Sequence, residues 1–126
     1  MSAAPSTPQF TGMPFFVYPV ADIGRSRAFY GGLLGLTEIA SWENEFVEFA
    51  VGDAALALST TMKGAVPGAR GGAAALETGR FDEAVAMLKA AGVRFALEPV
   101  DTGVCMFARF EDPDGNHIVL HRKHDA

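Results

Sequence analysis

The chain has 126 residues, of which 15 are acidic and 10 are basic, and its formal net charge is −5. This length predicts one domain. Nucleic-acid binders normally carry a basic stripe, so the acidic balance argues against a nucleic-acid partner. Hydrophobic residues make up 49% of the chain and charged residues 20%, which is typical of a globular protein with a hydrophobic core.

The lone cysteine, Cys105, cannot form an internal disulfide, which favours a reducing compartment. No apolar run approaches the ~18 residues that a membrane span needs, and the first residues carry no basic targeting segment. The sequence therefore predicts a cytoplasmic protein with no membrane partner. Residues 1–12 are small, polar and rich in proline, which predicts a disordered leader before a single domain over 13–126.

The first half of the domain predicts one strand, one helix and three more strands. The strand covers 15–20, and Pro19 confines it to a sheet edge or to its own end. The helix begins at Asp22 or at Ser26, which are both suitable N-caps, and Gly35 suits its end. The three following strands are predicted over 36–42, 45–51 and 54–59.

The second half predicts the same order after a Gly- and Pro-rich linker. Its helix covers 81–91, with an apolar stripe on one face and Gly92 as its stop. The turn Asp112-Pro113-Asp114-Gly115-Asn116 precedes the last strand. The strands of this half are predicted over 73–78, 93–97, 104–110 and 117–121.

The two halves form an internal repeat. A shift of 57 residues places Leu34-Gly35-Leu36 on Ala91-Gly92-Val93, so that helix, stop and next strand coincide. This predicts an α+β fold in which two βαβββ modules form a curved eight-stranded mixed sheet around a cleft. Module one covers about 13–60, the linker 61–71 and module two about 72–122.

The sequence resembles the vicinal oxygen chelate superfamily, which includes glyoxalase I, bleomycin-resistance proteins and extradiol dioxygenases. Three stretches carry the resemblance: VADIGRSRAFYGGLLGL over 20–36, FVEFAVGDAALAL over 46–58 and FEDPDGNHIVL over 110–120. The resemblance covers nearly everything between residues 14 and 122 and implies a glyoxalase-like domain. It fixes the fold better than the function, because this superfamily contains both enzymes and pure binding proteins.

The resemblance also implies where a divalent metal would be held. Metal-binding members supply His, Gln or Glu from the first and last strands of each half, and these positions correspond to Phe15, Ala57, Ala73 and Val119. None has a donor atom, so we expect no metal and no other cofactor there. His117 and His121 do not replace the ligands, because four residues on a strand separate their α-carbons by ~13 Å.

Strand alternation indicates which side chains line the cleft. The predicted ligand-binding residues are largely aromatic, with a few polar groups: Phe15, Trp42, Glu48, Phe107, Arg109, His117 and His121. Such a lining favours a small, partly aromatic and possibly anionic organic molecule. Arg109 needs an anionic partner on this face, and either Glu48 or the ligand could supply it.

Two classes of function remain open on these residues. The first, which we favour, is a glyoxalase/bleomycin-resistance-like binding protein with a degenerate metal site. The second is an enzyme of the same superfamily, a lyase, isomerase or dioxygenase, that uses a relocated metal or a histidine base. No catalytic residue can be named from the sequence. Concave apolar sheets are seldom left open to water, which predicts a homodimer.

Overall fold

A computed structural model describes residue 8 and residues 11–69 and 71–125, so most of the predicted leader lies outside the described residues. Two βαβββ modules follow each other along the chain, which confirms the predicted α+β class and the internal repeat. No helix of the described residues is long and apolar enough to cross a membrane.

Each module contains one four-stranded mixed sheet. In both sheets the first strand pairs in parallel with the last, and the remaining pairs are antiparallel, giving the orders β1-β4-β3-β2 and β5-β8-β7-β6. Module one comprises β1 (Phe16–Pro19), α1 (Ile23–Arg27), the π-helix η1 (Ala28–Leu33), β2 (Thr37–Trp42), β3 (Phe46–Val51) and β4 (Ala54–Ser59). Module two comprises β5 (Ala74–Glu77), α2 (Phe81–Ala90), β6 (Phe95–Asp101), β7 (Cys105–Glu111) and β8 (His117–Lys123).

Most predicted bounds agree with the structure to within two residues, and β6 is the clearest exception. The sequence predicts this strand over 93–97, but it covers Phe95–Asp101 and continues through Pro99. β6 is the edge strand of its sheet and its pairing with β7 shifts near Pro99, so the missing N–H group is tolerated. Pro19 likewise ends β1 at a sheet edge, as expected.

The first helix departs from regular α-helical geometry. Asp22 is its N-cap and accepts a 2.9 Å hydrogen bond from the Arg25 amide, while the alternative cap Ser26 is buried inside the helix. After one α-helical turn the chain widens into the π-helix, which contains the Gly31-Gly32 pair. Gly35 then ends the helix at φ +72°, the left-handed conformation expected for it.

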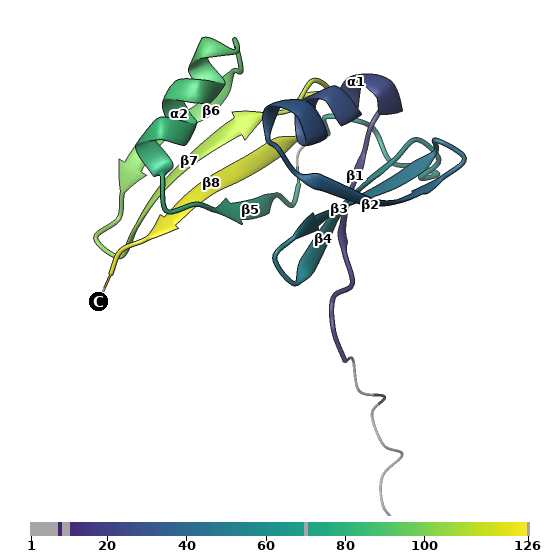
Figure 1. Cartoon of the computed structure of the whole chain (residues 1–126), viewed down its shortest axis with the longest axis horizontal. Helices are drawn as coiled ribbons and strands as arrows, with labels where there is room; N and C mark the ends of the chain where they lie inside the picture. The colour runs from purple at the N-terminus through teal and green to yellow at the C-terminus, as the bar shows by residue number, and fades with distance from the viewer. Residues whose placement is uncertain (1–7, 9–10, 70, 126) are drawn as a thin grey trace, which may run out of the picture.

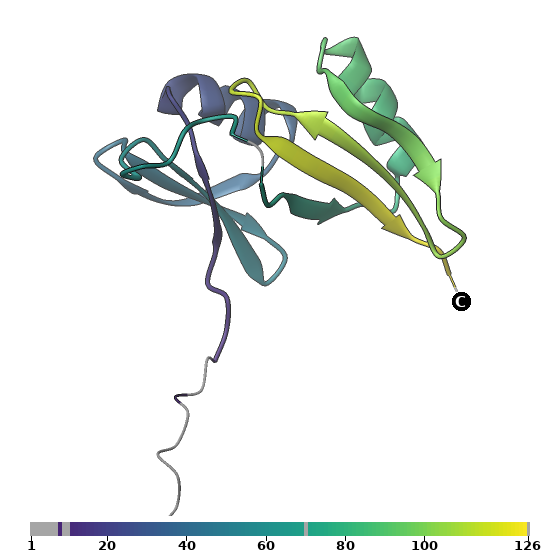
Figure 2. The same ribbon diagram turned by 180° about the vertical axis from the view of Figure 1, so that it is seen from behind.

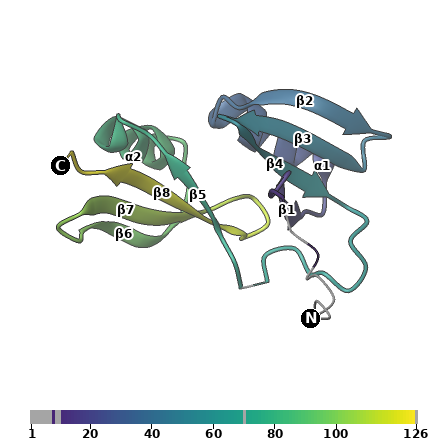
Figure 3. The ribbon, with the colours of Figure 1, turned by 90° about the horizontal axis from the view of Figure 1, so that it is seen from below.

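Both helices lie on the same side of the molecule, above the two sheets in Figure 1 and behind them in Figure 3. The helix-facing sides of the sheets form one buried core that crosses the module boundary. Phe29 of η1 packs its ring 6.3 Å from Phe110 of β7, centroid to centroid. The largest fully buried side chains come from both modules: Tyr30, Phe49, Leu56, Leu58, Phe81, Leu88, Phe110 and Ile118.

The turn over 112–116 joins the two modules, and Figure 2 shows it beside α1. The side chain of Asn116, which is 3% exposed, donates to the Pro19 carbonyl and accepts from the Gly68 amide, both at 2.9 Å. Tyr30 donates a 2.8 Å hydrogen bond to the buried Asp112 carboxylate. We call Tyr30, Asp112, Asn116 and Gly68 the joint.

Tyr18 bridges the two sheets where no backbone ladder connects them. Its hydroxyl donates to the His117 carbonyl at 2.7 Å and accepts from the Ala74 amide at 2.6 Å. Burial raises the pKa of Tyr18 to about 12, against the lowering effect of the Ala74 hydrogen bond. Burial, with the Asp112 carboxylate beside it, also raises the pKa of Tyr30. Both hydroxyls therefore keep their protons, and the bonds that hold the modules together are present at neutral pH.

Candidate functional site

The faces of the two sheets that point away from the helices carry the candidate site. Cross-strand register places Glu48 beside Ala57 and Ala40 on this face of sheet one, and Phe46 beside Ser59 and Trp42. Figure 3 shows both sheets in front of the helices, so that these faces open on the same side of the chain. We call them the uncovered faces.

Aromatic rings gather on the uncovered face of sheet one. The Phe46 ring lies 5.5 Å from Phe15 and 5.5 Å from Trp42, centroid to centroid, and both contacts are edge-to-face. Phe15 is 38% exposed and Trp42 is 53% exposed. We call these three side chains the aromatic cluster. It offers a flat organic molecule a partly exposed stacking surface, which is how aromatic side chains bind such ligands.

Ionisable side chains gather on the uncovered face of sheet two, at the end nearest module one. Glu111 and His117 are direct cross-strand partners, and His117 Nε2 lies 3.8 Å from Glu111 Oε2. Arg109, two residues before Glu111, pairs with Val119 and Leu97 and so points to the same face. We call Arg109, Glu111 and His117 the polar cluster.

The other end of this face holds a hydrogen-bonded pair. His121 Nδ1 lies 2.5 Å from Glu77 Oε1, and the Lys123 amide donates to Glu77 Oε2 at 2.7 Å. The Lys123 amide and then the His121 ring lower the pKa of Glu77. Phe107 is the direct neighbour of His121 on β7. The Glu77 carboxylate therefore occupies Nδ1 of His121, whose side chain is 32% exposed, whereas no hydrogen bond to the His117 ring is formed within the described residues.

The predicted ligand-binding residues thus fall into two groups on separate sheets. Phe15, Trp42 and Glu48 lie on sheet one, and Phe107, Arg109, His117 and His121 on sheet two. Among the described residues no ion pair joins Glu48 to Arg109, and neither has a carboxylate or cationic partner within 4 Å. The internal partner considered for Arg109 is therefore not engaged.

Two residues of this region were absent from the predicted set. Phe46 links Phe15 to Trp42, and its alternation with the buried Val47 and Phe49 along β3 was the signal that could have found it. Glu111 was overlooked because it borders the turn over 112–116. Its spacing of two residues from Arg109 was the signal that could have placed it on the same face.

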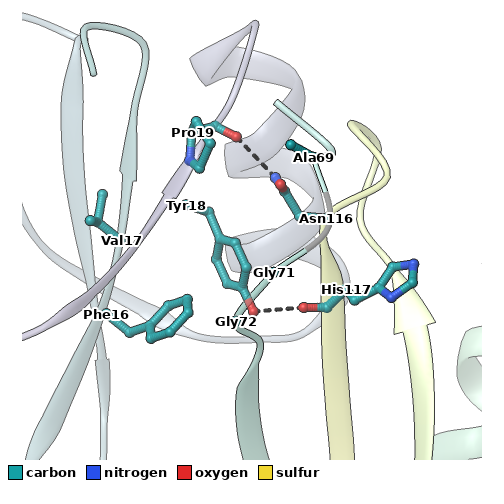
Figure 4. A pocket seen from close by; sticks show the side chains of 9 residues that line it. All are labelled: Phe16, Val17, Tyr18, Pro19, Ala69, Gly71, Gly72, Asn116 and His117. Carbon is teal, nitrogen blue, oxygen red and sulfur yellow. Dashed lines mark hydrogen bonds between the residues drawn. The ribbon is translucent and has the colours of Figure 1, made fainter. Parts of the chain in front are cut away.

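A small cavity of about 200 Å³ lies at the joint, between β1 and the start of β8 (Figure 4). Its walls include Tyr18, the backbone of Gly71 and Gly72, and Asn116. The His117 carbonyl accepts from Tyr18 at this cavity, whereas the His117 ring points away from it (Figure 4). The cavity is therefore smaller than most ligand pockets and separate from the His117 imidazole.

A larger groove of about 500 Å³ lies on the helix side of sheet two. Its walls are aliphatic and come from both modules, with Leu34 and Leu36 on one side and Leu88 of α2 on the other. Phe110 and Leu120 also line it, and Arg80 and Glu83 stand at its polar end. It marks incomplete packing between the first helix and α2.

The residues present do not suit the metal site that the fold family implies. Val17 pairs with Ala57 between the first and last strands of module one, and Ala75 pairs with Val119 in module two. The four positions Phe15, Ala57, Ala73 and Val119 have hydrocarbon side chains. Within residues 8, 11–69 and 71–125, no three His, Cys, Asp or Glu side chains gather closely enough to hold one metal ion.

Several solved structures resemble this chain over nearly its whole length. An antibiotic-binding protein, TnmS3 from Streptomyces sp. CB03234, is 27% identical, with 94% of this chain and all of that chain covered and a TM-score of 0.81. A glyoxalase/bleomycin resistance protein from the same strain is 30% identical, with 84% and 96% covered and a TM-score of 0.73. A superfamily member from Sphaerobacter thermophilus DSM 20745 is 25% identical, with 90% and 98% covered and a TM-score of 0.78.

The search of curated proteins gives no significant match. The model of the Glyoxalase/Bleomycin resistance protein/Dioxygenase superfamily matches residues 12–120. This range includes the joint, all of module one, and module two up to residue 120 of β8. The chain therefore belongs to the Glyoxalase/Bleomycin resistance protein/Dioxygenase superfamily.

Proposed function

We propose that this protein binds a small, partly aromatic organic molecule between its uncovered faces, without a metal ion. The observation that carries the proposal is that the two faces offer a ligand different kinds of side chain. Sheet one offers the aromatic cluster, and sheet two offers Arg109, which forms no ion pair within 4 Å among the described residues. An apolar surface with a few polar groups is typical of ligand sites. The similarity to an antibiotic-binding protein supports the same conclusion.

Arg109 orients the ligand in this proposal. Its neighbours on the sheet are the apolar Val119 and Leu97, and a guanidinium in such surroundings gains from an acceptor oxygen. Carboxylate, enolate and phenolate groups match its planar donor geometry. The ring system of the ligand would then stack on the aromatic cluster.

The proposed site requires a homodimer. Both uncovered faces open on the same side of one chain, so neither sheet can cover the other within that chain (Figure 3). A second copy would bring its polar cluster over the first copy's aromatic cluster and close the cleft. Sedimentation at micromolar concentration is expected to give twice the 13.3 kDa mass of one chain. A mass of 13.3 kDa would contradict the dimer.

Calorimetric titration with 2-naphthoate, a flat anion, tests the binding function. We expect saturable binding that Arg109→Ala weakens about 10- to 150-fold, the equivalent of 1.5–3 kcal/mol for a charged hydrogen bond. The melting temperature without ligand should change little, because Arg109 has no ion-pair partner among the described residues. Lys63→Ala, which removes an exposed cationic side chain of the linker, is the control. Absence of binding of both 2-naphthoate and its carboxamide, 2-naphthamide, to the native protein would contradict the proposal.

Elemental analysis tests the part of the proposal that says the ligand binds without a metal ion. After incubation with Zn²⁺, Mn²⁺, Ni²⁺ and Fe²⁺ and desalting, elemental analysis is expected to find no stoichiometric metal. The four family positions offer only hydrocarbon side chains, and such groups cannot coordinate these ions. One metal ion per chain, lost when a residue of the uncovered faces is replaced, would overturn this part and favour the enzyme.

A further inference from the structure

The polar cluster combines three different kinds of group in one small area. Glu111 is an acceptor, Arg109 is a donor, and His117 is either, depending on its tautomer. Glu111 faces His117 directly across the ladder, while Arg109 is the diagonal neighbour of His117. A ligand that reaches Arg109 therefore also reaches Glu111, two residues along the same strand face.

The hydrogen-bonding capacity of this cluster is largely unused by the described part of the chain. The Glu111 carboxylate is 17% exposed and accepts no hydrogen bond from a described residue. The His117 side chain is 12% exposed, and its Nε2 is buried without a hydrogen-bond partner among the described residues. Partly buried polar groups without partners are costly. Their concentration at one place indicates a position where a bound molecule supplies the missing partners.

We propose, on the basis of the binding function above, that the ligand presents a donor and an acceptor side by side. Its acceptor oxygen receives a hydrogen bond from Arg109, and its N–H or O–H donates to Glu111. Carboxamides, and carbonyls beside a hydroxyl, have this pattern. A bare carboxylate satisfies Arg109 but places a second negative charge beside Glu111. Glu111 is thus the residue that selects the neutral donor–acceptor group over the anion.

Two probes of nearly equal shape separate these possibilities. Both 2-naphthamide and 2-naphthoate offer an acceptor oxygen to Arg109, but only the amide offers N–H donors to Glu111. Calorimetry with the native full chain is expected to give about tenfold or tighter binding of the amide, since hydrogen bonds to a charged group reach this size.

Two variants test the role of Glu111. Glu111→Leu removes the acceptor and the charge, so the amide should bind about tenfold more weakly and the naphthoate several-fold more tightly, reversing the preference. Glu111→Gln keeps an acceptor and removes only the charge, so the naphthoate should gain while the amide loses less. Circular dichroism verifies folding, and the isosteric variant provides the test if the leucine variant does not fold. Glu45→Gln, at an exposed turn position of module one, is the charge-matched control.

The outcomes distinguish this inference from the binding function on which it rests. If both probes bind the native protein equally, or the naphthoate binds more tightly, the donor–acceptor inference is wrong and the binding function stands. The same conclusion follows if neither Glu111 variant changes the ratio of the two dissociation constants. If neither probe binds the native protein, the binding function itself fails.

Discussion

The two modules share one topology but pack their helices differently. In module one the first helix widens into a π-helix, and its Tyr30 reaches the Asp112 carboxylate of module two. In module two α2 is a regular helix that buries only Phe81 and Leu88 fully, beside a groove of about 500 Å³. The first helix therefore contacts residues of both modules, whereas α2 packs mainly against the sheet of its own module.

This difference shows that a repeated order of elements does not make two equal folding units. Module two completes its core with Phe29 of module one, which packs against Phe110. The joint adds polar bonds at the same boundary. We therefore expect the two modules to unfold as one cooperative unit, and the following variants test how far each depends on the other.

Asp112→Ala is expected to have the largest effect. The buried carboxylate accepts from Tyr30 at 2.8 Å, from the Asp114 and Asn116 amides at 2.9 and 2.8 Å, and from the Asn116 side chain at 2.9 Å. Its removal leaves several donors without partners, at about 1–3 kcal/mol each, so we expect a loss of roughly 4 kcal/mol. Urea unfolding measures it.

Asp53→Ala provides the control for this variant, because Asp53 is an exposed turn residue of module one. It should change the free energy of unfolding by less than about 0.5 kcal/mol. Two separate transitions in Asp112→Ala would indicate that the joint holds together modules that can fold alone. An unchanged stability would refute the role of the joint.

Leu58→Ala and Leu88→Ala compare the two cores directly. Both leucines are almost completely buried, at 0% and 1% exposure. Leucine-to-alanine changes in cores cost about 2–5 kcal/mol, depending on how well the site can close. Leu88 borders the groove, so we expect about 2 kcal/mol there and about 3–4 kcal/mol at Leu58. If urea unfolding gives equal losses in the free energy of unfolding for the two variants, the groove does not lower the cost of truncating Leu88.

Gly68→Ala tests the close approach of the linker to the joint. A Cβ atom at Gly68 would lie 2.1 Å from the Asp114 carbonyl oxygen, so the backbone must move. Gly64 has a similar φ, +78° against +79°, but open space around it. Both Gly64→Ala and Gly68→Ala therefore carry the strain of a positive φ, but only Gly68→Ala adds a steric clash. We expect Gly68→Ala to melt several degrees lower than Gly64→Ala. Equal melting temperatures would contradict the contact.

Glu77→Gln is expected to have the smallest effect, and it depends on pH. The pKa of Glu77 is lowered in the folded protein, chiefly by the Lys123 amide, so its stabilising contribution is present above the unfolded pKa. That contribution is lost as the pH falls through the lowered folded pKa. The variant should therefore melt slightly lower than the native protein at pH 7, and the gap should close in acid below about pH 4. A constant gap would contradict this assignment.

The order of the elements could be predicted from the sequence because the signals are local. Gly35 and Gly92 end their helices at φ +72° and +80°, and the turn at Glu43-Asn44 has positive φ at both residues. The π-helix could not be predicted, because the apolar spacing of a helix does not reveal its hydrogen-bond pattern. Alternation also placed Arg109 and His117 on one face, as the register confirms.

The parts that were missed depend on contacts between distant residues. Tyr30 and Asp112 are separated by 82 positions, and Tyr18 and Ala74 by 56. A single sequence carries no signal that such side chains meet. For the same reason the sequence placed Glu48 and Arg109 on cleft-facing positions of different modules, but it carried no signal of whether the two side chains meet.

The connection before the last strand differs between the two copies of the repeat. In module one only Gly52 and Asp53 separate β3 from β4, whereas in module two the five residues 112–116 separate β7 from β8. Those additional residues include Asp112 and Asn116, which form hydrogen bonds with Tyr30 and Pro19 of the other copy. The longer connection makes the contact between the modules asymmetric: the second copy contributes its 112–116 turn and the first copy contributes Tyr30 and Pro19, while the two-residue turn of the first copy has no equivalent of Asp112 or Asn116. A chain with two copies of module one would lack the 112–116 turn and therefore the hydrogen bonds to Tyr30 and Pro19.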